Sequence, residues 1–341
     1  MKAVVFREAT RPVQVEDMPT PSVGDSEVLV RIKAAGICHS DLHTIHGLYP
    51  VAKVPMVLGH EGAGIIEKSG KRVTSVSEGD RVAVDYVLSC GNCEYCNVGR
   101  NNLCNDAKYY GWNFDGTWAE YMLVQASNAF RLPKNVSFAE GALAGCAVVT
   151  GYHTMKISGI KAGDSVAVIG LGGVGTQLLQ WCKIFGATGI IGVDIDDDKL
   201  QLASKLGASA TVNARHEDVE SAVKKLTDGK GVDVAFEAIG RRETVEKMIS
   251  TVKKVGKAVI VGMCFEKISV TPVYDLMAKE IEIRNPTDHT KSEVEEVLAL
   301  LGKEKFDLAR SISQRVPIEK ATQGIETLEK TGKQVRIIIE P

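Results

Sequence analysis

The chain has 341 residues, of which 44% are hydrophobic and 25% charged, and its formal net charge is −2. This length exceeds one ordinary domain and predicts two domains, each with its own core. The nearly balanced charge gives no basic surface for nucleic acid or for an anionic membrane, so we expect a small-molecule partner.

The N-terminal residues and the cysteine content of the chain indicate in which cellular compartment the protein resides. The opening stretch MKAVVFREAT alternates like a strand and lacks the regions of a signal peptide. No apolar run reaches the ~18 residues that a membrane span needs. Eight cysteines, four of them between residues 90 and 104, are typical of metal binding in a reducing compartment rather than of a small disulfide scaffold. We therefore expect a cytoplasmic protein.

The first part of the chain, residues 1 to about 145, has the pattern of short strands separated by Gly, Asp and Pro. Strands are predicted over residues 27–38, 61–70, 80–88 and 119–124. This pattern predicts a β-rich domain with functional loops.

From about residue 146, apolar strand-like runs alternate with amphipathic helical segments. The strands are predicted over 165–170, 189–194, 210–213, 232–240 and 257–263. The helices are predicted over 174–186, 198–207, 217–229 and 242–254. This alternation indicates an α/β domain with a parallel, doubly wound sheet. A helix over 292–303 and a strand over 334–341 follow, and we expect this tail to return to the first domain.

A glycine loop joins the first strand and helix of that series. Gly170, Gly172 and Gly175 stand in G-x-G-x-x-G spacing within VAVIGLGGVGTQLLQ, with Gly173 and Val174 between them. A tight strand-to-helix turn would by itself explain the glycines. Glycines at a helix N-terminus also let a pyrophosphate approach free N–H groups, so the context predicts a dinucleotide site.

Asp194 ends the next predicted strand, in the stretch VDIDDDK. Its carboxylate would accept hydrogen bonds from the adenosine ribose and would repel a 2′-phosphate, which favours NAD over NADP. For the three aspartates at 196–198 we favour a helix N-cap and a solvated first turn.

The most conspicuous motif is C-x2-C-x2-C-x7-C, formed by Cys90, Cys93, Cys96 and Cys104. Four thiolates suit tetrahedral zinc; an iron–sulfur cluster is the alternative, and the polar flanking residues favour zinc. Four thiolates leave zinc no open coordination position, so this site is expected to staple a loop rather than catalyse.

A second set of potential ligands is dispersed. It comprises Cys38 in AAGICHSDLHTIHG, His60 and Glu61 in LGHEGAG, and Cys146 in LAGCAVVTGYH. Each cysteine or histidine taken singly is better explained as a buried packing residue, because sequence spacing does not make them neighbours.

In this order, GICHSDLH, GHEGAG, the four-cysteine loop and GLGGVG resemble the zinc-dependent alcohol dehydrogenases of the medium-chain dehydrogenase/reductase superfamily, over essentially the whole chain. The resemblance implies a GroES-like β-rich catalytic domain formed by residues 1–145 and 287–341. Between these segments it implies an NAD-binding Rossmann domain over residues 146–286.

The same resemblance implies a catalytic zinc. Cys38, His60 and Cys146 would be its ligands, and the fourth position would take water or the substrate oxygen. Glu61 matches a residue near the metal that ligates it transiently, and Asp41 matches a carboxylate that orients the zinc-bound histidine.

Further roles follow from the resemblance. Ser40 and His43 match a relay that carries the alcohol proton past the nicotinamide ribose to solvent. Four cofactor contacts are implied: the pyrophosphate by His39 and Arg336, the nicotinamide by Thr150, and the adenosine ribose by Lys199. Thr150, Lys199 and Arg336 could equally be ordinary polar surface residues.

Aromatic residues are candidates for the substrate pocket. Tyr86, Trp112 and Trp118 would give an apolar alcohol chain aromatic walls, and core packing is an equally good explanation of both tryptophans. His153, His216 and His289 are interpreted as surface residues.

The implied activity is the reversible NAD-dependent oxidation of a primary or secondary alcohol, through a zinc-bound alkoxide and hydride transfer to nicotinamide. Two zinc ions per chain and a homotetramer are also implied. The alternatives are a polyol or threonine dehydrogenase of the same superfamily, in which Glu usually replaces the residue matched by Cys146, and a zinc-free quinone reductase. A zinc-ribbon protein that binds nucleic acid would leave the glycine loop unexplained.

Overall fold

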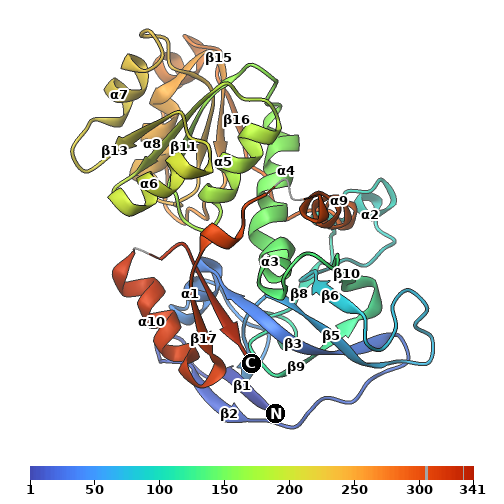
Figure 1. Cartoon of the computed structure of the whole chain (residues 1–341). Helices are drawn as coiled ribbons and strands as arrows, with labels where there is room; N and C mark the ends of the chain where they lie inside the picture. Colours follow the sequence, from blue (N-terminus) through green and yellow to red (C-terminus); the bar gives the residue numbers. More distant parts are fainter. Residues whose placement is uncertain (304–305, 333) are drawn as a thin grey trace. The chain divides into compact units, whose positions relative to one another are not determined.

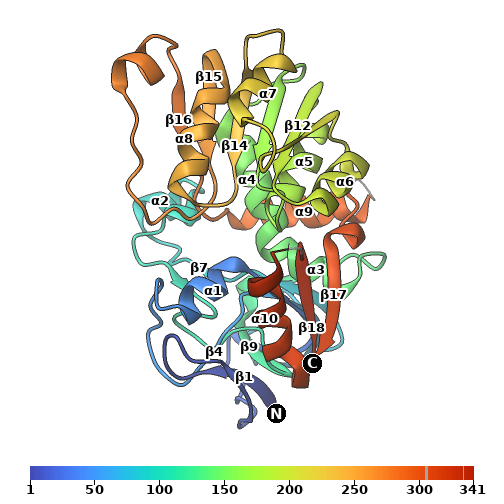
Figure 2. The same cartoon turned by 90° about the vertical axis from the view of Figure 1, so that its left-hand side faces the viewer.

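The structure, a computed structural model, describes residues 1–303, 306–332 and 334–341. The chain forms two compact units (Figures 1 and 2). The first unit joins Met1–Val149 to Asp288–Pro341, so it draws on both ends of the chain, and the second unit is Thr150–Thr287. Among the described residues, no helix is both long and apolar enough to cross a membrane.

The first unit is built mainly on antiparallel strands. Its largest sheet has the order β10-β6-β5-β3-β18-β17, with β9 also paired to β3; two smaller sheets are β2-β1-β4 and β7-β8. The strands are β1 Lys2–Phe6, β2 Gln14–Asp17, β3 Glu27–Ile37, β4 Met56–Val57, β5 Glu61–Ser69, β6 Arg81–Val84, β7 Val87–Leu88, β8 Lys108–Tyr109, β9 Tyr121–Gln125, β10 Ala129–Arg131, β17 Ile312–Pro317 and β18 Arg336–Glu340.

Strand β3 organises the large sheet. It pairs antiparallel with β5, β9 and β18, so the last strand of the chain lies against the N-terminal part. Strands β5 and β3 approach so closely that a Cβ at Gly64 would lie 2.1 Å from the carbonyl oxygen of Arg31, which requires glycine at this position.

Short helices complete the first unit. They are α1 His39–Ile45, α2 Glu94–Asn97, η1 Asn101–Leu103, η2 Ala126–Asn128, α3 Phe138–Leu143, η3 Ala144–Val148, α9 Lys291–Gly302, η5 Ala309–Ser311, η6 Ile318–Lys320 and α10 Ala321–Thr331. Helix α4, Val149–Ser158, carries the chain from the first unit into the second.

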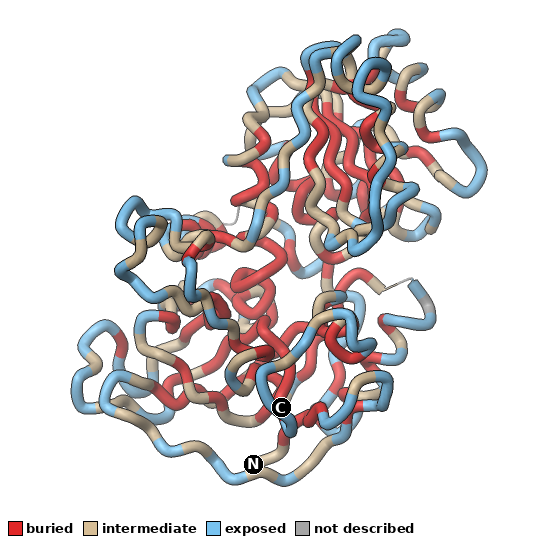
Figure 3. The backbone as a smooth tube through the Cα atoms, turned by 180° about the vertical axis from the view of Figure 1, so that it is seen from behind, coloured by how far each residue is buried: buried red, intermediate tan, exposed pale blue. Residues whose placement is uncertain are grey.

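The second unit is a six-stranded parallel sheet in the order β13-β12-β11-β14-β15-β16. Its strands are β11 Ser165–Ile169, β12 Gly189–Asp194, β13 Ala210–Asn213, β14 Val232–Glu237, β15 Val252–Ile260 and β16 Glu282–Arg284. Its helices after α4 are α5 Gly175–Ile184, α6 Asp197–Leu206, α7 Val219–Lys225, α8 Arg242–Thr251 and η4 Pro272–Met277. The strand order reverses beside β11, as in doubly wound sheets, and the central strands β11, β12 and β14 are mostly buried (Figure 3).

These units confirm the predicted α/β class with a β-rich part and a parallel-sheet part. The strand predicted over 80–88 is two strands, β6 and β7, in different sheets. The helix predicted over 242–254 ends at Thr251, and β15 begins at Val252 rather than at residue 257. Val252 pairs with Val232 of β14, and Val255 then adopts a φ of 59°, a bulge that the helical pattern of the sequence did not reveal.

Candidate metal centres and glycine loop

Four of the dispersed residues converge in the first unit. Cys38 follows β3 and is the N-cap of α1, His60 and Glu61 stand where β5 begins, and Cys146 lies in η3. One ligand atom from each lies within 4.8 Å of the others. The pairing of β3 with β5, which sets Gly36 opposite Glu61, brings three of the four together.

Local sequence places the fourth residue, Cys146. Helix α3 begins with a capping box in which Ser137 Oγ accepts from Glu140 N at 3.3 Å and Glu140 Oε2 accepts from Ser137 N at 2.8 Å. The chain continues from α3 directly into η3, whose wider turn carries Cys146. Such turns occur frequently at functional sites.

The donor set fits a zinc ion. The cluster consists of two thiols, one imidazole and one carboxyl group. Each of these residues is buried, with an exposed fraction of 8% or less. Both carboxylate oxygens of Glu61 are buried and neither accepts a hydrogen bond within the described chain, although Oε1 has an ion pair with Arg336. Buried polar atoms without partners are costly, and sulfur and imidazole ligands are those that zinc prefers.

The pKa values of the two thiols are shifted in opposite directions. A hydrogen bond between them is the largest cause that lowers the pKa of Cys38 well below its ordinary value and raises the pKa of Cys146. A thiol with a lowered pKa is readily converted to the thiolate that binds a metal.

Asp41 fixes the orientation of His60. The Asp41 Oδ1 atom lies 3.0 Å from His60 Nδ1, and its Oδ2 atom accepts a hydrogen bond from the Cys38 backbone N–H at 2.9 Å. Burial lowers the pKa of His60, but the charge and hydrogen bond of Asp41 raise it well above its ordinary value. In the neutral imidazole, a proton held on Nδ1 by Asp41 leaves Nε2 without a proton and able to bind a metal.

Glu61 is paired with Arg336 from β18. Glu61 Oε1 lies 3.2 Å from an Arg336 Nη atom, and Arg336 also donates to the carbonyl of Ile37 at 3.1 Å. Burial raises the pKa of Glu61 to about 7 against the opposing charge of Arg336. A Cβ at Gly36 would lie 2.0 Å from Glu61 Oε2, so only glycine leaves room for this carboxylate. Arg336 is 2% exposed and not a surface residue; its contact to a pyrophosphate stays a prediction.

Aromatic rings pack on the imidazole of His60. The centroids of Trp112 and Tyr86 lie 4.7 and 5.0 Å from that of His60, and Trp112 Nε1 donates to Thr44 Oγ1 at 2.7 Å. Both rings therefore lie beside a candidate zinc ligand, and their part in a substrate pocket stays a prediction. Trp118 is fully buried and donates to the carbonyl of Gly36 at 2.9 Å, which makes it a core residue.

The predicted relay residues lie on α1. Ser40 Oγ lies 3.4 Å from His60 Nε2, and Ser40 and His43 are partly exposed. Burial is the largest cause that lowers the pKa of His43. His39 is exposed at the start of the same helix. The roles of these three side chains stay predictions.

The cysteine loop forms a second cluster. Sulfur atoms of Cys90, Cys93, Cys96 and Cys104 lie within 4.8 Å of one another, around α2 and η1. Backbone N–H groups of Cys96 and Asn105 are the main causes that lower the pKa of Cys93 to about 6, and burial raises that of Cys96 to about 11. Four sulfur donors at this spacing fit a closed tetrahedral site.

The glycine loop has the tight turn that its motif predicts. Gly170 adopts a φ of 92°, and a Cβ at Gly175 would lie 1.8 Å from the Gly170 carbonyl oxygen, so both positions require glycine. A Cβ at Gly172 would meet nothing within 4 Å, which leaves the backbone there open to a ligand. Gly173 and Val174 complete the loop, with Val174 at the N-cap of α5.

The remaining predicted cofactor residues lie in the second unit. Asp194 ends β12 and accepts hydrogen bonds from the N–H groups of Leu171 at 2.8 Å and Ile195 at 2.7 Å. Thr150 lies on α4 and Lys199 on α6, both partly exposed. Asp196 caps α6 as expected, accepting from Asp198 and Lys199 N–H groups.

Two histidines interpreted as surface residues are buried. His153 is 5% exposed and His289 is fully buried, with His289 Nε2 3.0 Å from Asp85 Oδ1, whereas His216 is exposed. The surface interpretation was wrong for His153 and His289, because a sequence does not show which face of α4 or which loop packs inward.

The structure adds one residue near the candidate site that the sequence did not single out, Asp288. Its carboxylate accepts hydrogen bonds from the hydroxyl groups of Tyr86 at 2.9 Å and Tyr109 at 3.2 Å. No motif marks it, and more than 200 positions separate it from Tyr86.

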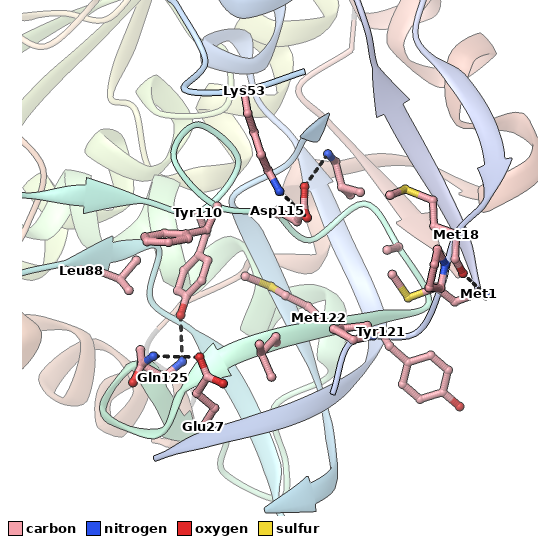
Figure 4. Close-up of a pocket in the computed structure, with 17 residues that line it drawn as sticks. Met1, Met18, Glu27, Lys53, Leu88, Tyr110, Asp115, Tyr121, Met122 and Gln125 are labelled. Atoms are coloured by element: carbon pink, nitrogen blue, oxygen red, sulfur yellow. Dashed lines mark hydrogen bonds and ion pairs between the residues drawn. The ribbon is translucent and has the colours of Figure 1, made fainter. Parts of the chain in front are cut away.

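A pocket of about 210 Å³ lies elsewhere in the first unit (Figure 4). Its lining includes Met18, Met122 and the ion pair of Lys53 with Asp115, 3.2 Å apart. None of the predicted site residues is among those that line it in the described chain.

Comparison with known proteins gives matches in both parts of the chain. Residues 24–134 match the family of the alcohol dehydrogenase GroES-like domain, and residues 173–303 match the zinc-binding dehydrogenase family. An alcohol dehydrogenase of Geobacillus stearothermophilus is 34% identical over 342 residues, covering 100% of this chain and 99% of that protein.

A second relative is the NAD-dependent alcohol dehydrogenase of Sulfurisphaera tokodaii, 32% identical over 99% of this chain and 100% of that protein. The crystal structure of a proposed zinc-binding dehydrogenase from Sinorhizobium meliloti 1021, bound to NADP, superposes with a TM-score of 0.93 at 31% identity. It covers 100% of this chain and 99% of that chain. The GroES-like and Rossmann-type assignments are therefore confirmed.

Proposed function

We propose that the chain reversibly oxidises a primary or secondary alcohol with NAD. This proposal is supported by its family, because the chain belongs to the zinc-dependent alcohol dehydrogenases of the medium-chain superfamily. The chain is an oxidoreductase whose substrate is a small molecule. The main support for the proposed reaction is the buried cluster of potential metal ligands formed by Cys38, His60, Glu61 and Cys146.

In this proposal Cys38, His60 and Cys146 hold the catalytic zinc, and Glu61 stands by as an additional ligand. Zinc supplies Lewis acidity that favours loss of the alcohol proton, and NAD supplies the hydride acceptor. Asp41 holds the proton on His60 Nδ1 and so keeps Nε2 directed at the metal. Arg336 balances the Glu61 carboxylate, which limits the negative charge near the ligands.

The proton leaves through the side chains of α1. Ser40 Oγ, 3.4 Å from His60 Nε2, receives the alcohol proton, and His43 passes it to solvent. The lowered pKa of His43 supports this role, because its imidazole is then neutral and able to accept a proton.

The cofactor is NAD in this proposal. Gly170, Gly172 and Gly175 cradle its pyrophosphate at the start of α5, with His39 and Arg336 as further contacts. The Asp194 carboxylate binds the ribose hydroxyls and disfavours the extra phosphate of NADP. The NADP-bound Sinorhizobium structure is the reason to test both cofactors.

A second zinc is proposed in the cluster of Cys90, Cys93, Cys96 and Cys104, giving two per chain. This ion staples the loop, since four thiolates leave it no position for substrate. Free thiols throughout the described chain fit a reducing, cytoplasmic location.

A homotetramer is proposed for the assembly. Its support is the apolar surface of the second unit, where η4 buries none of its residues and Tyr274 and Met277 are 75% and 67% exposed. Surfaces of this kind mark contacts between proteins. No nucleic acid or membrane partner is proposed.

A steady-state panel tests this function: simple alcohols, polyols and threonine against NAD and NADP, on protein of measured zinc content. We expect the highest kcat/KM for an alcohol with NAD, by at least about tenfold over NADP. Preference for a polyol or for threonine would favour the alternative within the superfamily, and the absence of any oxidation would contradict the proposal.

A further inference from the structure

Asp288 follows β16 and comes shortly before α9, in the segment that rejoins the first unit. Its two carboxylate oxygens accept one phenol hydroxyl each, Tyr86 on Oδ1 and Tyr109 on Oδ2. Its backbone has a φ of 48°, a strained conformation, and the residue is partly exposed. Strained residues of this kind cluster at functional sites.

The carboxylate shares its aromatic surroundings with the candidate zinc ligand His60. Tyr86 contacts both, because its ring packs on His60 at 5.0 Å while its hydroxyl binds Asp288. The Tyr109 and Trp112 centroids lie 6.4 Å apart, and Trp112 lies 4.7 Å from His60. A small molecule whose oxygen is held beside His60 would therefore reach these rings and Asp288.

The charge at Asp288 is not balanced by an ion pair within the described residues. Asp41 and Asp85 each face a histidine, and Glu61 faces Arg336. In contrast, no ion pair joins Asp288 to a basic side chain in the part of the chain that the structure describes. The two phenols occupy only part of the carboxylate's capacity to accept hydrogen bonds.

An anion among aromatic rings is a poor lining for an aliphatic chain and a good one for a cation. Burying a carboxylate against methylene groups costs free energy without compensation. An ammonium group instead gains an ion pair with the carboxylate and attraction to the ring faces.

We propose that Asp288, with the rings of Tyr86, Tyr109 and Trp112, binds the protonated amino group of the substrate, so that small amino alcohols are preferred over simple alcohols. This inference rests on the proposed function, which holds the substrate hydroxyl at the cluster of Cys38, His60 and Cys146. The carbinol C–H bond gives its hydride to NAD, the O–H proton is released, and a carbonyl forms. The amino group does not react and is kept in the product.

Three alcohols of matched skeleton test the inference at neutral pH. Isopropanolamine, propylene glycol and sec-butanol carry an ammonium, a hydroxyl and a methyl group at one position. The wild-type kcat/KM should be about tenfold higher for isopropanolamine than for the other two.

Asp288→Asn is the diagnostic variant, because asparagine also tolerates this backbone conformation. It should lower kcat/KM about tenfold for isopropanolamine and leave that for sec-butanol within about twofold. Tyr109→Phe, which removes one phenol from the carboxylate, should give a smaller loss with the same selectivity. Asp25→Asn, on an exposed carboxylate of the same unit, should change neither value.

A binding measurement makes the result independent of turnover. Isopropanolamine added to zinc-loaded protein without NAD should give a saturable change in tryptophan fluorescence, because Trp112 lines the subsite. Asp288→Asn should weaken this binding about tenfold.

Each outcome decides the inference. Equal loss on all three alcohols would show that Asp288 only holds the fold, and would overturn the subsite. The absence of saturable binding to wild type, or an equal preference for propylene glycol, would overturn it too. Binding that depends on Asp288 without oxidation of any alcohol would sustain the subsite and refute the proposed function.

Discussion

The Asp41 carboxylate lies 3.0 Å from His60 Nδ1, with Asp41 2% and His60 1% exposed. The same carboxylate caps α1 by accepting the Cys38 N–H at 2.9 Å. One side chain thus sets the positions of two proposed zinc ligands.

Replacing this carboxylate tests that relationship. Asp41→Asn should lower zinc affinity and kcat by about 10–100-fold, because the amide holds the imidazole less firmly in the required tautomer. Chelator competition and steady-state kinetics measure the two effects. Asp25→Asn should alter neither, and unchanged zinc affinity in folded Asp41→Asn protein would contradict the assigned role.

The dispersed cluster should be indispensable for turnover and dispensable for the cofactor. Cys38→Ser should reduce kcat by more than about 10³, since it removes a thiolate ligand. A fluorescence titration with NADH should give nearly the wild-type dissociation constant, because the glycine loop belongs to the second unit. Near-normal activity in zinc-analysed Cys38→Ser would remove the basis of the catalytic assignment.

The cysteine loop should behave in the opposite way. Cys93→Ser should lower the zinc content from about two ions per chain to about one. Its melting temperature should fall by about 5 °C, as the loop loses its staple. The folded fraction should still turn over alcohol. Cys264→Ser, at a cysteine outside both clusters, is the matched control, and loss of chemistry in fully folded Cys93→Ser would count against a staple.

The stability that Asp233 gives the second unit should be lost in acid. Its carboxylate accepts from Ser165 N at 3.0 Å and Ser165 Oγ at 2.7 Å and pairs with Lys253. Burial opposes these contacts, but together they lower the pKa of Asp233 below its ordinary value of 3.8. A pKa lower in the folded than in the unfolded chain adds stability above the unfolded value and loses it as the pH falls through the folded one.

Asp233→Asn should therefore lower the free energy of unfolding at neutral pH by about 1 kcal/mol. The difference from wild type should shrink as the pH falls below 3.8. Urea unfolding at several pH values measures it, with Asp25→Asn as the control. A difference that does not vary with pH would show that the carboxylate charge contributes nothing.

Sequence patterns predicted the parallel sheet well because strand and helix periods are local properties. The helical pattern was wrong for residues 252–254. These residues belong to β15, in which Val252 pairs with Val232, although their sequence continues the amphipathic pattern of the preceding helix. His289 shows a second limit, since its burial against Asp85 depends on how the C-terminal segment returns to the first unit.

By itself the sequence determined the four-cysteine loop, the glycine turn and the alternation of strands and helices, because residues close along the chain meet at little entropic cost. Only the tertiary structure brought Cys38, His60, Glu61 and Cys146 within 4.8 Å, through the pairing of β3 with β5 and the turn after α3. It alone also set Asp288 on the hydroxyl groups of Tyr86 and Tyr109. Contacts across such separations depend on the packing of the whole unit, which no local pattern encodes.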